Sequence, residues 1–272
     1  MIPAAFDYVR PSSLDEALAE LADPGARPIA GGHSLLPMMK LRLARPSRLI
    51  DLAGLDLGAI GLEDGAVRIG ALTTYDELLG LGEEVPLPGA LRDAAAEVGD
   101  AQVRNAGTVG GALAHGDPAC DFAAAVIAAG STLVLRSPDG AREVAAEDFF
   151  VGPFTTVLEQ QELLVELRVP VPAPGEGSAY VAFEDPASGY PLAGAAVRLG
   201  RDRGCTVGLT GVGAQPLRAA AVEKAIGDGT DLGEALDMLG LVSVDGDGEH
   251  RRQLACVAVS RALEAARRRA GA

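Results

Sequence analysis

The chain has 272 residues, 48% of them hydrophobic, which is enough to build substantial cores in a two-domain or bipartite protein. It carries 23 basic and 38 acidic residues, and the net charge of −15 argues against nucleic acid or an anionic membrane surface as a partner. Its three cysteines lie too far apart for a metal site or a disulfide framework, which is typical of a reducing cytoplasm. The longest apolar run, residues 122–135, is too short to cross a bilayer, so we expect a cytoplasmic protein without a transmembrane segment.

The first part of the chain predicts a small β-loop-α-β unit. Ser13 and Glu16 are spaced as in the capping box that begins a helix. A short strand at 28–30 leads into a loop with two adjacent glycines, and apolar positions at 35–43 predict a short helix. A second strand is expected at 49–51.

The middle of the chain continues with a hairpin about Asp64-Gly65, a pair that suits a tight turn between antiparallel strands. Thr74 and Glu77 predict a second capping box, and Asp117 is expected to be the N-cap of a helix with Pro118 in its first turn. The strands expected here are 59–62, 67–71, 132–136 and 163–169, and the further helices are 91–98 and 119–129.

Prolines and glycines crowd residues 170–177 and indicate a domain boundary. Beyond it, three strands precede three helices, an order that favours an antiparallel sheet with helices on one face. The expected strands are 179–184, 193–199 and 205–212, and the expected helices are 219–226, 232–239 and 251–269. The residues therefore predict an α+β protein.

Two glycine-rich loops give the strongest chemical signal. The first is Ile29-Ala30-Gly31-Gly32-His33-Ser34-Leu35, and the second ends in Thr108-Val109-Gly110-Gly111. Paired glycines let a backbone turn sharply and approach a ligand, and the N–H groups after such turns favour negative charge. Two such loops predict a cradle for a diphosphate. The Gly-x-Gly-x-x-Gly pattern of a Rossmann site and the Walker pattern are both missing.

Positive charge gathers around the first loop in an otherwise acidic chain. Residues 27–50 contain no carboxylate and five cations, which are Arg27, Lys40, Arg42, Arg45 and Arg48. This segment can serve a phosphate ligand or an acidic partner, or it can be a solvated face.

Each remaining candidate residue has two interpretations. His33 and His115 flank the loops and are either general acid–base groups or loop histidines with a structural hydrogen bond. Asp121 either reaches a ribose hydroxyl or charges a helix N-terminus, and Tyr190 either stacks on a flat ring or covers a core edge. No cluster has metal-ligand spacing and no nucleophile–base pair stands out, so we assign no catalytic residue and no metal ligand.

The motifs together resemble one family, the FAD-binding medium subunits of molybdenum hydroxylases, which is the carbon monoxide dehydrogenase and xanthine dehydrogenase group. The resemblance covers essentially the whole chain. It rests on Ala30 to Leu35, Thr108 to Gly111, the run Gly116-Asp117-Pro118-Ala119-Cys120-Asp121, the opening residues 2–8, the run 36–44 and the ending 251–269.

The resemblance implies a fold in two domains. Residues 1–172 would form an FAD-binding domain of the PCMH or vanillyl-alcohol-oxidase type, with subdomains at about 1–56 and 57–172. Residues 176–272 would form a C-terminal domain of the carbon monoxide dehydrogenase flavoprotein type, an antiparallel sheet with helices.

The resemblance also implies which residues bind FAD. In the family the two glycine loops hold the pyrophosphate, an aspartate contacts the cofactor, an apolar residue lies near the flavin, and an aromatic residue lies beside the isoalloxazine ring. The matching positions here are Ile29, Ala30, Gly31, Gly32, His33, Ser34, Leu35, Thr108, Val109, Gly110, Gly111, Asp121, Leu164 and Tyr190.

The implied function is electron transfer within a complex. A small subunit with [2Fe–2S] clusters would pass electrons to FAD on this chain, and a large subunit would hold the molybdenum cofactor. The assembly implied is a cytoplasmic dimer of heterotrimers, a heterohexamer, that reduces an external acceptor such as a quinone and can associate with the inner face of the membrane. Carbon monoxide is the favoured substrate. A purine, an N-heterocycle or an aldehyde is the alternative within the family, and a stand-alone flavin oxidase is the alternative outside it.

One departure from the family concerns charge. Many members carry a basic residue where this chain has Glu184-Asp185. A cation there would stabilise negative charge on the flavin, whereas carboxylates disfavour it and lower the reduction potential.

Overall fold

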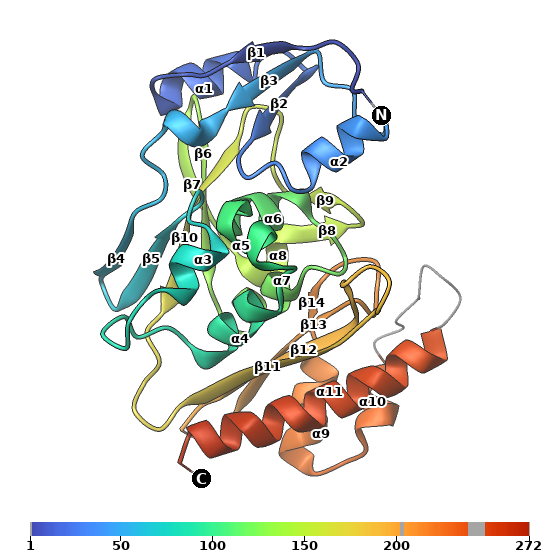
Figure 1. The fold of residues 1–272 in the computed structure, drawn as a ribbon. Coiled ribbons are helices and arrows are strands. Elements are labelled where there is room, and N and C mark those ends of the chain that lie inside the picture. Colours follow the sequence, from blue (N-terminus) through green and yellow to red (C-terminus); the bar gives the residue numbers. More distant parts are fainter. Residues whose placement is uncertain (1, 202–203, 239–247, 272) are drawn as a thin grey trace.

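A computed structural model describes residues 2–201, 204–238 and 248–271 and shows an α+β fold in three parts (Figure 1). The three parts follow one another along the chain, and each is built on its own β-sheet. The C-terminal sheet is antiparallel and carries helices. This architecture confirms the predicted fold class.

The N-terminal part is a parallel sheet with the strand order β1-β3-β2. The predicted β-loop-α-β unit is present as β2, α2 and β3. Ser13 caps the first helix as expected, although the Glu16 carboxylate accepts from Ser12 rather than from Ser13. The elements are β1 (Asp7–Val9), α1 (Leu14–Glu20), β2 (Ala26–Ile29), α2 (Leu35–Lys40), β3 (Arg48–Asp51) and the 3₁₀ turn η1 (Leu52–Gly54).

Helix α2 is shorter than the predicted helix at 35–43. The backbone N–H of Leu43 donates to the carbonyl of Met38 at 2.8 Å, and that of Arg42 donates to Met39 at 3.0 Å. This is the Schellman pattern of helix ends, with Arg42 at a φ of +61° in the position that glycine usually takes. A local C-cap therefore ends the helix, although its residue is not glycine.

The middle part contains an antiparallel sheet with the order β4-β5-β10-β6-β7 and a group of short helices. The strands are β4 (Ile60–Glu63), β5 (Ala66–Gly70), β6 (Thr132–Ser137), β7 (Gly140–Ala145) and β10 (Leu163–Pro170), with a small ribbon of β8 (Phe150–Gly152) and β9 (Thr155–Thr156). The helices are α3 (Tyr75–Leu79), α4 (Gly89–Glu97), α5 (Ala101–Ala106), α6 (Val109–His115), α7 (Asp121–Ala128) and α8 (Ala146–Phe149).

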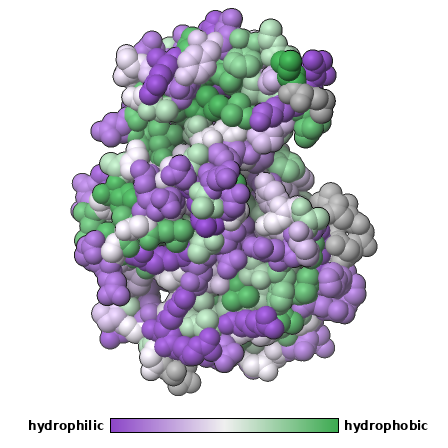
Figure 2. Space-filling model, viewed as in Figure 1, coloured by the Kyte–Doolittle hydropathy of each residue, from purple (hydrophilic) through white to green (hydrophobic). Residues whose placement is uncertain are grey.

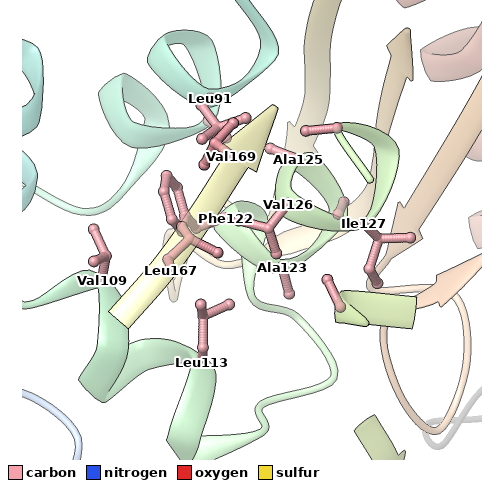
Figure 3. Close-up of a cluster of buried hydrophobic side chains, with 14 of the residues drawn as sticks. Leu91, Val109, Leu113, Phe122, Ala123, Ala125, Val126, Ile127, Leu167 and Val169 are labelled. Carbon is pink, nitrogen blue, oxygen red and sulfur yellow. The ribbon is translucent and has the colours of Figure 1, made fainter. Parts of the chain in front are cut away.

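Helix α7 lies at the centre of the largest core, and all of its residues are buried. Figure 3 shows Phe122 of α7 among side chains from α4, α6 and β10, including Leu91, Leu113 and Leu167. An apolar helix of this kind has no solvent face, so its position is fixed by packing on every side.

The predicted start of α7 is wrong. The helix begins at Asp121, and its N-cap is Cys120. Asp117 instead accepts from the N–H of Ala119 through Oδ1 at 2.9 Å, a local turn in which Pro118 precedes the helix. An aspartate side chain can satisfy a turn as well as a helix end, so the residue types alone do not separate the two.

The C-terminal part is an antiparallel sheet with the order β11-β12-β13-β14. Its own helices α9 to α11 cover one face, as predicted, and α4 and α7 of the middle part pack against the other (Figure 1). The predicted helix at 232–239 corresponds to α10, but its last residue lies outside the described residues. The elements are β11 (Gly177–Glu184), β12 (Pro191–Leu199), β13 (Cys205–Thr210), β14 (Leu217–Arg218), α9 (Ala220–Asp228), α10 (Leu232–Asp237) and α11 (Gly248–Arg269).

The surface of the N-terminal part carries several large apolar side chains. Hydrophobic residues show on this part in the space-filling view (Figure 2). The large apolar side chains exposed there are Ile2, Phe6, Tyr8, Leu36, Leu41 and Leu43. Among the described residues, no helix is long and apolar enough to span a membrane.

Candidate functional site

The two glycine-rich loops are far apart in the sequence but touch in the structure. A Cβ atom on Gly31 would lie 2.0 Å from the carbonyl oxygen of Ala106 and 2.9 Å from the Cα of Gly107. Any side chain at Gly31 would therefore push the loops apart. Gly111 also faces the first loop, since a Cβ on it would lie 3.7 Å from the Cβ of Ala30.

The first loop presents free backbone donors. The loop lies between β2 and α2, and Gly32 turns it with a φ of +73°. Within the described residues, no acceptor pairs with the N–H groups of Gly31, Gly32, His33 or Ser34, and these four residues are half-buried or exposed. Unpaired N–H groups on a glycine turn form a concave donor surface that favours an anion.

The second loop differs from its predicted form, because it is a helix junction rather than a free loop. Helix α5 ends at Ala106 and α6 begins at Val109. Three of its N–H groups have partners inside the chain: Val109 donates to the carbonyl of Thr73 at 2.9 Å, Gly110 to that of Ala71 at 2.9 Å and Gly111 to Oγ1 of Thr108 at 3.2 Å. At these three residues the loop therefore offers close backbone approach rather than free N–H donors.

Asp121 is buried next to the C-terminal sheet. The residue is 8% exposed, and its carboxylate accepts a hydrogen bond of 2.6 Å from the hydroxyl of Tyr180 in β11. Burial raises the pKa of Asp121 from 3.8 to about 7, although the hydrogen bond from Tyr180 acts in the opposite direction. Sequence reasoning did not find Tyr180, because nothing in the pattern of a buried strand marks which of its residues reaches another element.

Further carboxylates lie close to Asp121. Glu97 lies at the end of α4 and Glu184 at the end of β11, and burial together with the nearby Glu184 raises the pKa of Glu97. Both glutamates also raise the pKa of Asp121. The departure seen at Glu184 in the sequence therefore places negative charge beside Asp121.

Tyr190 is half-exposed, whereas Leu164 is buried. Tyr190 lies in the β11–β12 hairpin with a 50% exposed side chain, and burial and then the nearby Asp117 raise the pKa of its hydroxyl. Asp121 and Cys120 also interact with that hydroxyl, so Tyr190 lies near the start of α7. Leu164 in β10 is buried in the same core as Val109. The structure thus brings Tyr190 and Asp121 together, with Leu164 packed in the core that α6 covers.

The two histidines have structural contacts. Nδ1 of His33 donates to the carbonyl of Gly31 at 2.8 Å, which closes the first loop on itself. The ring of His115 lies 5.2 Å from that of Phe154, and burial lowers the pKa of His115 below its ordinary value of 6.5. These contacts fit the interpretation of both residues as structural loop histidines.

The cations around the first loop divide into two groups. Arg27 donates to the carbonyls of Pro24 and Ala26, and Arg48 pairs with Asp7 and Glu20, so these two stabilise the N-terminal part. The exposed cations that follow the loop are Lys40, Arg42 and Arg45.

In the part of the chain that the structure describes, no group of three or more His, Cys, Asp or Glu residues could hold a metal ion.

Comparison with known proteins identifies relatives over the whole length. Residues 4–172 match the family described as the FAD binding domain in molybdopterin dehydrogenase. The chain is 40% identical over 289 residues to the carbon monoxide dehydrogenase medium chain of Afipia carboxidovorans, covering 99% of both chains. It is 39% identical over 235 residues to the glyceraldehyde dehydrogenase medium chain of Sulfolobus acidocaldarius, covering 83% of this chain and 82% of the relative.

A solved structure shows the same fold. The structure is that of a carbon monoxide dehydrogenase from Hydrogenophaga pseudoflava that lacks the Mo-pyranopterin moiety of the molybdenum cofactor. Its matching chain has a TM-score of 0.91 and 38% sequence identity, and the match covers 99% of both chains.

Proposed function

We propose a specific electron-transfer function for this chain, which belongs to the family of FAD-binding medium subunits of molybdenum hydroxylases. In this proposal the chain takes electrons from an iron–sulfur subunit onto a bound FAD and passes them to an external acceptor. The observation that carries it is the first glycine loop, whose unpaired N–H groups face no acceptor in the described chain and lie against the second loop. FAD supplies the redox chemistry when bound, and the protein supplies binding and orientation.

The residues of the site fit a diphosphate-containing cofactor. The first loop offers N–H donors to the negative oxygens, and a Cβ at Gly31 would fill the space between the loops. The second loop offers a backbone surface without a side chain at Gly111, which faces Ala30 of the first loop. We propose that the cofactor is held by Ile29 to Leu35, Thr108 to Gly111, Asp121, Leu164 and Tyr190.

The side chains beyond the loops would act on the flavin end of the cofactor. Asp121 would accept a hydrogen bond from a cofactor hydroxyl, Tyr190 would offer an aromatic face, and Leu164 an apolar contact. The carboxylates of Glu97 and Glu184 near Asp121 disfavour additional negative charge in this region. We therefore expect a lower reduction potential than a cation at Glu184 would give.

The proposed assembly is the three-subunit arrangement of the family. A small subunit with [2Fe–2S] clusters and a large subunit with the molybdenum cofactor would join this chain in a cytoplasmic dimer of heterotrimers, with a quinone or another compound as acceptor. The exposed apolar side chains of the N-terminal part, such as Leu41 and Leu43, offer contact area for a partner subunit. Any association with the inner face of the membrane would come through the complex.

The substrate we propose first is carbon monoxide. Medium chains of enzymes for carbon monoxide and for glyceraldehyde share 40% and 39% of their residues with this chain, so identity alone does not select the substrate. The large subunit would decide between carbon monoxide, a purine, an N-heterocycle and an aldehyde.

We also propose the division into domains at 1–172 and 176–272, with subdomains at about 1–56 and 57–172. Strand β10 ends at Pro170 and β11 begins at Gly177, which supports the first boundary. The turn η1 ends at Gly54 and β4 begins at Ile60, which supports the second.

An absorbance spectrum tests the proposed function directly. The chain is purified alone and together with the products of its neighbouring genes, and the cofactor is then released with acid. The proposal expects releasable FAD in the chain alone, which is reduced by substrate only when the partner subunits are present. Reduction by a small substrate without partners would indicate a stand-alone oxidase, and a lack of flavin in both preparations would refute the assignment of the loops.

A further inference from the structure

One hydroxyl of the C-terminal sheet reaches into the site that is built mainly by the middle part. Tyr180 of β11 donates to Oδ1 of Asp121, and both side chains are buried. No other side chain of the described residues donates a hydrogen bond to this carboxylate, which otherwise accepts only from the backbone N–H of Asp121 itself. The contact joins the C-terminal sheet to the first residue of α7.

The neighbouring strand is built to leave room for this hydroxyl. A Cβ atom on Gly194 of β12 would lie 2.1 Å from the hydroxyl oxygen of Tyr180 and 2.8 Å from Cγ2 of Thr210. Tyr180 pairs with Ala196 in the sheet, so Gly194 is its diagonal neighbour on the same face. A side chain at Gly194 would displace the hydroxyl from the position in which it meets Asp121.

We propose that Tyr180 is a positioning residue of the FAD site, through which the C-terminal sheet fixes the orientation and the charge of Asp121. This inference rests on the proposed function, in which Asp121 is the carboxylate that contacts the cofactor. A hydrogen bond to the charged form of a buried carboxylate favours that form, so Tyr180 opposes the effect of burial.

The other titratable groups around Asp121 do not share this role. Glu97 and Glu184 favour the neutral form of Asp121, because their own negative charge repels a carboxylate. The groups that face Asp121 from neighbouring elements are Glu97 of α4, Glu184 and Tyr180 of β11, Tyr75 of α3, Tyr190 of the β11–β12 hairpin and the adjacent Cys120. Among these side chains, Tyr180 is the hydrogen-bond donor to the carboxylate.

The test follows the binding of FAD as a function of pH. The dissociation constant of FAD for the full chain is measured by quenching of flavin fluorescence between about pH 5 and pH 9, a range that covers the titration of a buried carboxylate. The wild type should show one midpoint that Asp121→Asn abolishes. Tyr180→Phe should move this midpoint upward by about one to two pH units, the size expected when a charged group loses one hydrogen bond.

Two further variants separate positioning from packing. Gly194→Ala keeps the tyrosine but displaces its hydroxyl, so it should move the midpoint in the same direction as Tyr180→Phe. Tyr8→Phe is the matched control, because Tyr8 also donates to an aspartate, Asp51, but in the N-terminal sheet. Its midpoint should equal that of the wild type. If Tyr180→Phe fails to fold, the pH midpoint of FAD binding to Gly194→Ala is compared with that of the wild type instead.

The outcomes distinguish this inference from the proposed function. If the wild type binds no FAD, the proposed function itself is refuted. If FAD binds but the affinity does not vary with pH, or if the midpoints of wild type and Tyr180→Phe coincide, only the role of Tyr180 is refuted. A loss of affinity without a shift in midpoint would also overturn it, because that is the result of a purely structural change.

Discussion

Replacing Asp121 with asparagine should stabilise the flavin-free protein at alkaline pH. Burial raises the pKa of this carboxyl from 3.8 to about 7, so the folded state keeps a proton that the unfolded chain has already lost. The stability of the wild type therefore falls as pH rises between these two values. A shift of this size corresponds to about 4 kcal/mol, and the side chain is too buried for solvent to screen much of it. Asparagine has nearly the same shape and can still accept from Tyr180.

The assay is urea unfolding of wild type and Asp121→Asn at pH 4 and at pH 8. We expect similar stability at pH 4, where the wild-type carboxyl is protonated in the fold. At pH 8 the variant should be more stable by up to about 4 kcal/mol. Asp139→Asn removes the same charge from an exposed turn and should show no such divergence. A variant that is destabilised equally at both pH values would show that ionisation of Asp121 costs the fold nothing.

Three further perturbations test other parts of the structure. Gly31→Ala should abolish FAD binding, because its Cβ would collide with the Ala106 carbonyl. Gly61→Ala is the control, since a Cβ at Gly61 meets open space and FAD binding should be retained. Titration of each variant with FAD measures the binding. Phe122→Ala should cost about 3–5 kcal/mol in urea unfolding, and a loss below about 1 kcal/mol would contradict its central place in the core. The hydrogen bond from Arg142 lowers the pKa of Glu162, so the ionised carboxylate stabilises the fold and this stabilisation is lost when the carboxylate is protonated. Glu162→Gln should therefore lower the melting temperature at pH 7 but not below about pH 3, which thermal melts at the two pH values would show.

In the proposed site, the C-terminal sheet contributes directly to the surroundings of Asp121. The buried faces of β11, β12 and β13 pack on α4 and α7, so Tyr180 can reach the start of α7. If the C-terminal sheet only shielded α4 and α7 from solvent, the hydroxyl of Tyr180 would not need the space that the missing side chain of Gly194 leaves for it. The arrangement links the geometry of one carboxylate to the packing of a separate sheet.

Much of the fold could be predicted from local sequence signals, because each signal is satisfied within a few residues. The capping box of Thr74 and Glu77 forms both of its hydrogen bonds. The hairpin of β4 and β5 turns at Asp64 and Gly65, which both have positive φ as a tight hairpin requires. The C-terminal strands pair in sequence order, so their antiparallel sheet could also be predicted.

Errors arose where one residue pattern suits two local structures. The glycines and threonine of the second loop suit a turn, yet Thr108 caps α6 and the N–H groups of Val109 and Gly110 bind other segments. Tertiary packing decides here, since the close approach of α6 to Ala71 is possible only without a side chain at Gly110. Short helices such as α5 have too little periodicity to be recognised from sequence.

The sequence by itself determined the glycine loops, their order and the family to which they point, because these are properties of residue type and spacing. Only the tertiary structure decided that the loops touch, that the N–H groups of Val109, Gly110 and Gly111 are paired within the chain, and that Tyr180 meets Asp121. Most of these contacts join segments that are distant in the chain. The contact between Tyr180 and Asp121 depends on the packing of α7 against the C-terminal sheet, and no local pattern encodes that packing.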